Sequence, residues 1–129
     1  MDATITGFHH VKLPVSDVSR SREWYERVLG LALEIEFEED GVVRGVALRL
    51  PHGGGGGIAL REDPDHAAGL AGFDPVALLV PERDQVEQWR ARLDELGVEH
   101  GGIVTGHHGG KVLVGLRDPD GLEIRLYAD

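Results

Sequence analysis

Charged and imidazole side chains alternate in two stretches near the ends of this chain, and they are the residues best suited to chemistry. His10 and Lys12 alternate in the first stretch. In the second stretch the same spacing relates Glu123, Arg125 and Tyr127. Alternate residues of a strand share one face of a sheet. Because an imidazole can exchange protons near neutral pH, His10 is a candidate general base.

Two further arginines, Arg49 and Arg61, fall in predicted strands. The candidate ligand-binding residues are His10, Lys12, Arg49, Arg61, Glu123, Arg125 and Tyr127. Several cations beside one imidazole would suit a carboxylate, phosphate or enolate group. We expect Arg125 to anchor such a group, with His10 across the pocket. Alternatively, Glu123 pairs with Arg125 or Arg61 across the sheet, and these charges compensate one another.

The chain repeats one unit of about sixty residues, and this repeat determines which elements carry the candidate side chains. Stretch 7–15 recurs as 72–80, with Gly and Phe at corresponding positions and alternating aliphatic residues in one register. The register extends to the only two tryptophans of the chain, Trp24 and Trp89. Repetition of this kind indicates two similar structural units.

Hydrophobic periodicity predicts a strand, a helix and three further strands in the first unit. We expect strand 8–15, a helix ending at 29, and strands 31–38, 42–50 and 58–62. Ser16 or Asp17 can cap the helix at its start, and Gly30 can end it in the left-handed conformation. Asp40-Gly41 is typical of a tight hairpin turn. The five glycines Gly53–Gly57 predict a flexible loop.

The second unit repeats this order after a polar linker. We expect strand 76–80, helix 83–96, and strands 98–104, 111–116 and 122–127. Gly97 ends the helix, and Asp118-Pro119-Asp120-Gly121 forms a hairpin. The predicted organisation is a first βαβββ unit (1–62), a linker (63–71) and a second βαβββ unit (72–129). Neither unit can bury its sheet alone, so we expect an α+β fold with curved, partly barrel-like mixed sheets around a groove and helices outside.

Composition narrows the classes of function. The chain has 129 residues, no cysteine and a formal net charge of −10. It therefore has enough residues for one domain and has no thiolate chemistry. The acidic balance argues against nucleic-acid partners, whose phosphates need basic surfaces. No apolar run is long enough for a membrane span and no signal peptide is evident, so we expect no membrane partner and a cytoplasmic location.

Several features of the chain occur together: two βαβββ units, an early His-Val strand, a helix ending in Val28-Leu29-Gly30-Leu31, and a terminal Asp-Pro-Asp-Gly hairpin. This combination resembles the vicinal oxygen chelate superfamily, which includes glyoxalase I, bleomycin-resistance proteins, extradiol dioxygenases and methylmalonyl-CoA epimerase. The resemblance covers about residues 7–127. It implies a concave pair of sheets that binds a small molecule, and commonly a homodimer. The register that the resemblance implies places the candidate ligand-binding residues, Arg49 and Arg61 included, inside this groove.

The resemblance also implies where a metal would bind, on the first and last strands of each unit. Those four positions match His10, Ala59, Pro75 and Arg125 in this chain. Only His10 can ligate a metal, because Ala and Pro side chains have no donor atoms and a guanidinium is a permanent cation without an acceptor. We therefore expect no metal and no cofactor.

A rearranged metal site is the alternative to this expectation. His10 could ligate zinc together with His108 or His100 and with Glu123, because zinc needs only three protein ligands in a catalytic site. His9 would lie on the opposite face of a strand from His10, and we therefore expect it to be structural.

These observations predict a glyoxalase/bleomycin-resistance-like protein that binds a small organic molecule, anionic in character, in the groove of its sheets without a metal. The alternative is a lyase, isomerase or dioxygenase of the same superfamily, with a rearranged metal site or with His10 as general base. A third possibility is a regulatory or assembly module whose groove binds nothing of consequence.

Overall fold

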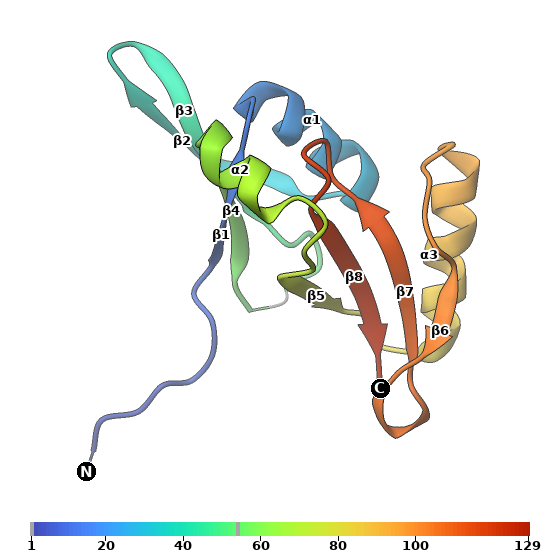
Figure 1. The fold of residues 1–129 in the computed structure, drawn as a ribbon. Coiled ribbons are helices and arrows are strands. Elements are labelled where there is room, and N and C mark those ends of the chain that lie inside the picture. The colour runs from blue at the N-terminus through green and yellow to red at the C-terminus, as the bar shows by residue number, and fades with distance from the viewer. Residues whose placement is uncertain (1, 54) are drawn as a thin grey trace. The chain divides into compact units, whose positions relative to one another are not determined.

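The computed structural model describes residues 2–53 and 55–129, which form two compact units (Figure 1). The first unit comprises residues 1–67 and the second residues 68–129. Each contains a four-stranded mixed sheet, with strand order β1-β4-β3-β2 in the first and β5-β8-β7-β6 in the second. The predicted α+β fold with tandem βαβββ units is therefore confirmed.

The first unit follows the predicted order of elements. They are β1 (Val11–Val15), α1 (Val18–Leu29), β2 (Ala32–Glu39), β3 (Val42–Arg49) and β4 (Gly57–Glu62). Strand β1 pairs with β4 in parallel, and the pairs β2–β3 and β3–β4 are antiparallel. Hairpin β2–β3 projects from the rest of the unit (Figure 1), so much of β2 is exposed to solvent.

Helix α1 begins and ends as its sequence predicts. The Asp17 carboxylate accepts a hydrogen bond from the Arg20 N–H (3.1 Å), which satisfies a free donor at the helix start. Gly30 is left-handed (φ 74°) and its N–H bonds to the Glu26 carbonyl (3.0 Å). The helix packs on β3 and β4 through one buried face, composed of Val18, Ser21, Trp24, Tyr25, Val28 and Leu29. The sheet contributes the alternate residues of its strands to this core, which leaves the opposite face of the sheet open.

The glycine-rich stretch is only in part the loop that was predicted. Gly54 lies outside the described residues. Gly57 is already the first residue of β4, and a Cβ atom there would lie 2.5 Å from the Leu48 carbonyl oxygen. A Cβ on Gly56 would lie 3.1 Å from the Phe8 carbonyl oxygen. The last two glycines therefore permit close approach of neighbouring backbone.

The second unit repeats the order with one shorter strand. Its elements are β5 (Val76–Leu79), α3 (Arg83–Glu95), β6 (Ile103–Thr105), β7 (Lys111–Arg117) and β8 (Glu123–Ala128). Strand 98–104 was predicted, but regular pairing with β7 begins only at Ile103, and before it Gly101 and Gly102 each form one backbone hydrogen bond with Val114. Gly102 is left-handed (φ 83°), and Gly101 approaches an irregularity in β7 at left-handed Gly115 (φ 73°). The ladder therefore begins only after these glycines.

A further helix, α2 (Pro64–Leu70), occupies the segment predicted as a polar linker. The Asp63 carboxylate accepts a hydrogen bond from the His66 N–H (3.1 Å), and proline is suited to the first helical position. Ala67 is the buried residue of this short helix. None of the helices formed by the described residues is long and apolar enough to span a bilayer.

Candidate functional site

The open face of the first-unit sheet carries a hollow of about 990 Å³, and its lining residues all belong to the first unit. We call it the first-unit hollow. Its floor consists of small residues on β3 and β4, including Gly45, Ala47 and Ala59. Ala47 and Ala59 lie opposite each other in the antiparallel pair β3–β4. Because these side chains are small, the sheet itself forms the bottom of the hollow.

Two predicted ligand-binding cations line the hollow, and they differ in whether a carboxylate of the described residues is paired with them. Arg61 forms an ion pair with Glu39 (2.7 Å). Lys12 lies beside Ala59 in the parallel pair β1–β4. Among the described residues, no carboxylate lies within ion-pair distance of the Lys12 ammonium group. Lys12 is therefore the lining cation whose charge is available to a ligand.

The far side of the hollow has the opposite charge. Glu34 and Glu38 of β2 line it, as does Glu39. Arg49, which was also predicted to bind ligand, is the last residue of β3 and is exposed outside the lining. Alternation along β3 predicted that the Arg49 side chain would line the hollow. Because β3 ends at Arg49, at the edge of the hollow, the side chain lies outside the lining.

The two histidines before β1 both line the hollow. Their Nδ1 atoms lie 2.9 Å apart, so one ring donates a hydrogen bond and the other accepts it. The prediction that His9 lies on the opposite face is wrong, because β1 begins only at Val11 and strand alternation does not apply before it. The candidate general base, His10, therefore has a second imidazole as its hydrogen-bond partner.

Arg125 of the second unit is already paired with carboxylates. Its guanidinium Nε donates to Glu123 (2.7 Å), and its Nη1 lies 3.2 Å from Asp74. The hydrogen bond from Arg125 holds the pKa of Glu123 below its ordinary value, against the opposing effect of burial. The same hydrogen bond raises the pKa of Arg125. Of the two possibilities that the sequence left open for this arginine, the structure contains the pairing with Glu123.

Tyr127 has a structural role in the second unit. Its hydroxyl accepts a hydrogen bond from the His107 N–H, and the two rings lie 5.8 Å apart. A Cβ atom on Gly106 would lie 2.5 Å from this hydroxyl. Tyr127 therefore supports the short 3₁₀ turn His107–Gly109, where His108 is left-handed (φ 54°) and exposed.

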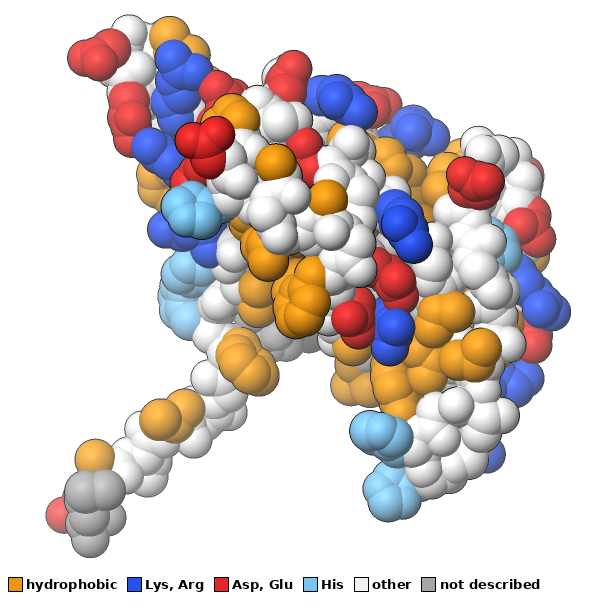
Figure 2. Space-filling view, viewed as in Figure 1, with side chains coloured by type: hydrophobic (Ala, Val, Ile, Leu, Met, Phe, Trp, Pro, Cys, Tyr) orange, Lys and Arg blue, Asp and Glu red, His pale blue; other side chains and the backbone are white. Residues whose placement is uncertain are grey.

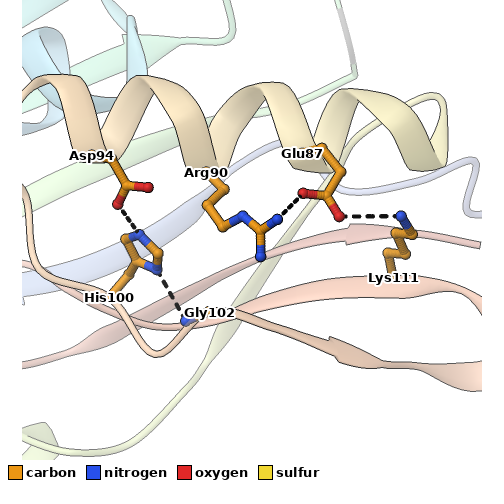
Figure 3. Close-up of polar contacts among 6 residues, drawn as sticks. All are labelled: Glu87, Arg90, Asp94, His100, Gly102 and Lys111. Atoms are coloured by element: carbon orange, nitrogen blue, oxygen red, sulfur yellow. Dashed lines mark hydrogen bonds and ion pairs between the residues drawn. The ribbon is translucent and has the colours of Figure 1, made fainter.

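Both ring nitrogens of His100 are occupied, as Figure 3 shows. Nδ1 accepts a hydrogen bond from the Gly102 N–H (3.0 Å), so the ring proton is on Nε2, which donates to Asp94 (2.7 Å). Only 10% of the His100 side chain is exposed. In the same view Glu87 of α3 interacts with both Arg90 and Lys111. These contacts attach α3 to the segments around β6 and β7, and they leave His100 without a nitrogen for a metal.

The residues at the superfamily's metal positions do not fit a metal ion. Strand register pairs Ala59 with Lys12 in the first unit and Arg125 with Ala77 in the second, which confirms that Ala59 and Arg125 are equivalent. Neither alanine nor a paired guanidinium can ligate a cation. In the part of the chain that the structure describes, no three His, Asp or Glu side chains are arranged to hold a metal. Within the second unit, His100 has both ring nitrogens occupied and Glu123 accepts a hydrogen bond from Arg125, so neither offers a free donor to the rearranged set.

Acidic and basic side chains are interspersed over the face drawn in Figure 2. Many of them form ion pairs within their own unit, such as Arg22 with Glu26 and Arg44 with Glu62. With a net charge of −10, this pattern offers no basic stripe to a phosphate backbone on that face.

Comparison with known proteins agrees with the observed fold. A family model described as "Glyoxalase/Bleomycin resistance protein/Dioxygenase superfamily" matches residues 7–126. A curated relative, "Putative ring-cleaving dioxygenase MhqA" of Bacillus subtilis (strain 168), is 27% identical over 134 residues. That match covers 97% of this chain but 41% of the relative, so the chain spans about two-fifths of that protein.

Solved structures with this fold include proteins of different descriptions. TnmS3, an antibiotic binding protein from Streptomyces sp. CB03234, has a TM-score of 0.76 and 23% identity, with 98% of each chain covered. The integron cassette protein HFX_CASS4, from the mobile metagenome of the Halifax Harbour sewage outfall, has a TM-score of 0.78 and 21% identity, with 97% of this chain and 100% of that chain covered. At these identities the likeness shows the fold alone.

Proposed function

Because the family match spans most of its length, the chain belongs to the Glyoxalase/Bleomycin resistance protein/Dioxygenase superfamily, and we propose that it binds a small organic molecule in the first-unit hollow without a metal ion. The observation that carries this proposal is the hollow itself. Its volume of about 990 Å³ lies at the upper end of the range of small-molecule sites. Its lining combines apolar and small residues with a few polar groups, which is the composition of such sites.

Binding without a metal is favoured by the side chains present. Ala59 offers no donor atom, and the Arg125 guanidinium lies between two carboxylates. The name of TnmS3 describes a protein of this fold that binds an antibiotic. We propose the same kind of role here, in which a shaped hollow holds an organic molecule and the protein performs no Lewis-acid chemistry on it.

The proposal is tested by filling the hollow. Ala47 lies on its floor and is half-buried, so Ala47→Leu would place an isobutyl group where the ligand is expected. Ala91→Leu on the exposed side of α3 is the matched control. Compounds that raise the melting temperature of the wild type are then titrated by calorimetry against both variants. We expect Ala47→Leu to abolish binding and Ala91→Leu to retain it. Binding that survives Ala47→Leu unchanged would place the ligand elsewhere.

A second candidate function is proton transfer, and it is favoured by the His9–His10 contact. If His10 Nδ1 carries the shared proton, its Nε2 has a free lone pair at the wall of the hollow. A bound ligand with an acidic C–H bond would then exchange that hydrogen with solvent. Nuclear magnetic resonance (NMR) in deuterium oxide measures this exchange, which we expect to be lost in His10→Gln. Exchange at the same rate in His10→Gln would exclude His10 as the base.

A further inference from the structure

We infer that the first-unit hollow selects a flat aromatic molecule with one anionic group, which Lys12 binds at the β1 side. This inference rests on the proposed function, and it names the chemical class of the ligand. Three features of the hollow carry it: the order of residues across the sheet, the position of its unpaired cation, and the apolar side chains opposite that cation.

Strand register defines a row of side chains across the hollow. Lys12 of β1 lies beside Ala59, Ala59 lies opposite Ala47, and Ala47 lies opposite Ile35 of β2. The row thus has a cation at one end, two methyl groups in the middle and a branched apolar side chain at the other end. Neighbouring strands are about 4.8 Å apart, so the two ends are separated by roughly 14 Å across the backbone.

The next row, which consists of Arg61, Gly45 and Phe37, forms one side of this trough and makes its far end aromatic. Gly45 lies opposite Phe37 of β2 and has no side chain above the sheet. A Cβ on Gly45 would lie 3.1 Å from the Leu60 carbonyl oxygen, so the backbone is tightly packed there. Arg61 of β4 lies opposite Gly45 in this row, and a Cβ on Gly45 would lie 3.9 Å from the Arg61 Cδ and 3.8 Å from the Phe37 Cδ2. The flat part of the floor is therefore the row of Ala59 and Ala47, bordered on this side by the stem of Arg61 and the Phe37 ring. A planar ring can contact such a surface over its whole face, whereas a branched aliphatic molecule cannot.

Phe37 and Ile35 are about half exposed, at 48% and 47%. Burying such side chains stabilises a complex in proportion to the apolar area removed from water. An aromatic ring gains further from an offset or edge-to-face contact with Phe37. The far end of the trough therefore favours a ring over a polar group.

The charges orient the ligand in the trough. Lys12 has no carboxylate within ion-pair distance among the residues described, so an anion near it meets an uncompensated ammonium group. Glu34 and Glu38 line the β2 side and repel a carboxylate placed there. Their strand lies roughly 14 Å from β1, which exceeds the screening length of about 8 Å at physiological salt. The carboxylates of β2 therefore direct the anionic group toward Lys12 without cancelling its attraction.

The experiment uses probes of matched size. Calorimetry compares 2-naphthoate, the uncharged 2-naphthalenemethanol and the saturated, non-planar decahydro-2-naphthoate on the wild type, on Lys12→Met and on Arg49→Met. Arg49 is the matched control because it is an exposed cation of the same unit outside the lining. We expect 2-naphthoate to bind the wild type most tightly and to lose about tenfold in affinity in Lys12→Met. Neither 2-naphthalenemethanol binding to Lys12→Met nor 2-naphthoate binding to Arg49→Met should weaken by more than about twofold.

Two outcomes would overturn the inference. If decahydro-2-naphthoate binds as tightly as 2-naphthoate, the hollow does not select a flat aromatic molecule. If Lys12→Met leaves 2-naphthoate affinity unchanged, or if Arg49→Met weakens it equally, Lys12 does not bind the anion directly. Ala47→Leu distinguishes these results from failure of the proposed function. It should prevent binding of any probe that occupies the hollow, whichever contacts the probe makes there. A probe that still binds Ala47→Leu contradicts both proposals.

Discussion

The ion pair between Glu123 and Arg125 should stabilise the folded protein, and this contribution should depend on pH through the ionisation of Glu123. Glu123→Gln removes the negative charge and keeps an oxygen that can accept from Arg125. The Glu123 side chain is only 11% exposed, and its oxygen lies 2.7 Å from the Arg125 Nε. A hydrogen bond between charged groups contributes about 1.5–3 kcal/mol. Because 40% of Arg125 is exposed, solvent screening reduces this, and we expect a loss of about 1 kcal/mol at pH 7.

The sign of the pH dependence follows from the lowered pKa of Glu123. A carboxyl group whose pKa is lower in the folded protein contributes stability above its unfolded pKa of about 4.3. That contribution is lost as the pH falls through the folded pKa. The difference in the free energy of unfolding between wild type and Glu123→Gln should therefore be constant from pH 7 to about 5 and should decrease toward zero at lower pH.

Urea unfolding at a series of pH values measures this difference directly, and thermal melts should show a gap of roughly 4 °C at pH 7. Glu99→Gln is the matched control, because Glu99 is exposed and has no carboxylate–cation contact within 4.0 Å among the described residues. Adding Arg125→Gln completes a double-mutant cycle, which isolates the coupling of the two groups. A gap that persists unchanged below the unfolded pKa, or a coupling energy of zero, would refute the assignment of this pair.

Further predictions concern other parts of the chain. The Ser21 hydroxyl is buried in α1 without a hydrogen-bond partner among the described residues, so Ser21→Ala should raise the free energy of unfolding by about 1 kcal/mol, measured by urea titration. His100→Ala leaves the Gly102 N–H without its acceptor and should cost about 1–2 kcal/mol, whereas His108→Ala at an exposed position should cost less than about 0.5 kcal/mol. We also propose a homodimer, in keeping with the superfamily resemblance, and sedimentation at micromolar concentration should give twice the 14.0 kDa chain mass. A single species at the chain mass would contradict that proposal.

Most of the fold could be predicted from the sequence because local signals agreed with the repeat. Asp17 and Gly30 mark the ends of α1, and the turn at Asp40-Gly41 has both residues left-handed, as its sequence predicts. Strand β6 was predicted too long because glycines interrupt its pairing with β7. Helix α2 was missed because its single buried residue, Ala67, gives no hydrophobic periodicity.

The candidate site could be predicted only in part. Strand alternation correctly predicted that Lys12 and Arg61 line the hollow. The register of the internal repeat correctly predicted that Ala59 and Arg125 occupy equivalent positions. The partner of each charge depends on side-chain geometry, which sequence spacing does not determine. Arg125 alternates with Glu123 on one strand, so their pairing was one of two open possibilities. The adjacent sequence His9-His10 was a visible signal, but its interpretation required knowing that β1 begins at Val11.

The most direct test of the central claim is NMR mapping of a bound ligand on the whole ¹⁵N-labelled chain. Gly45, Gly57 and Ala59 line the hollow, so their backbone amides report on it. Gly101 and Gly115 of the second unit lie outside its lining. If the ligand occupies the first-unit hollow, titration should shift the first three resonances strongly and the last two much less. Large shifts confined to Gly101, Gly115 and their neighbours, with Gly45, Gly57 and Ala59 unchanged, would contradict it.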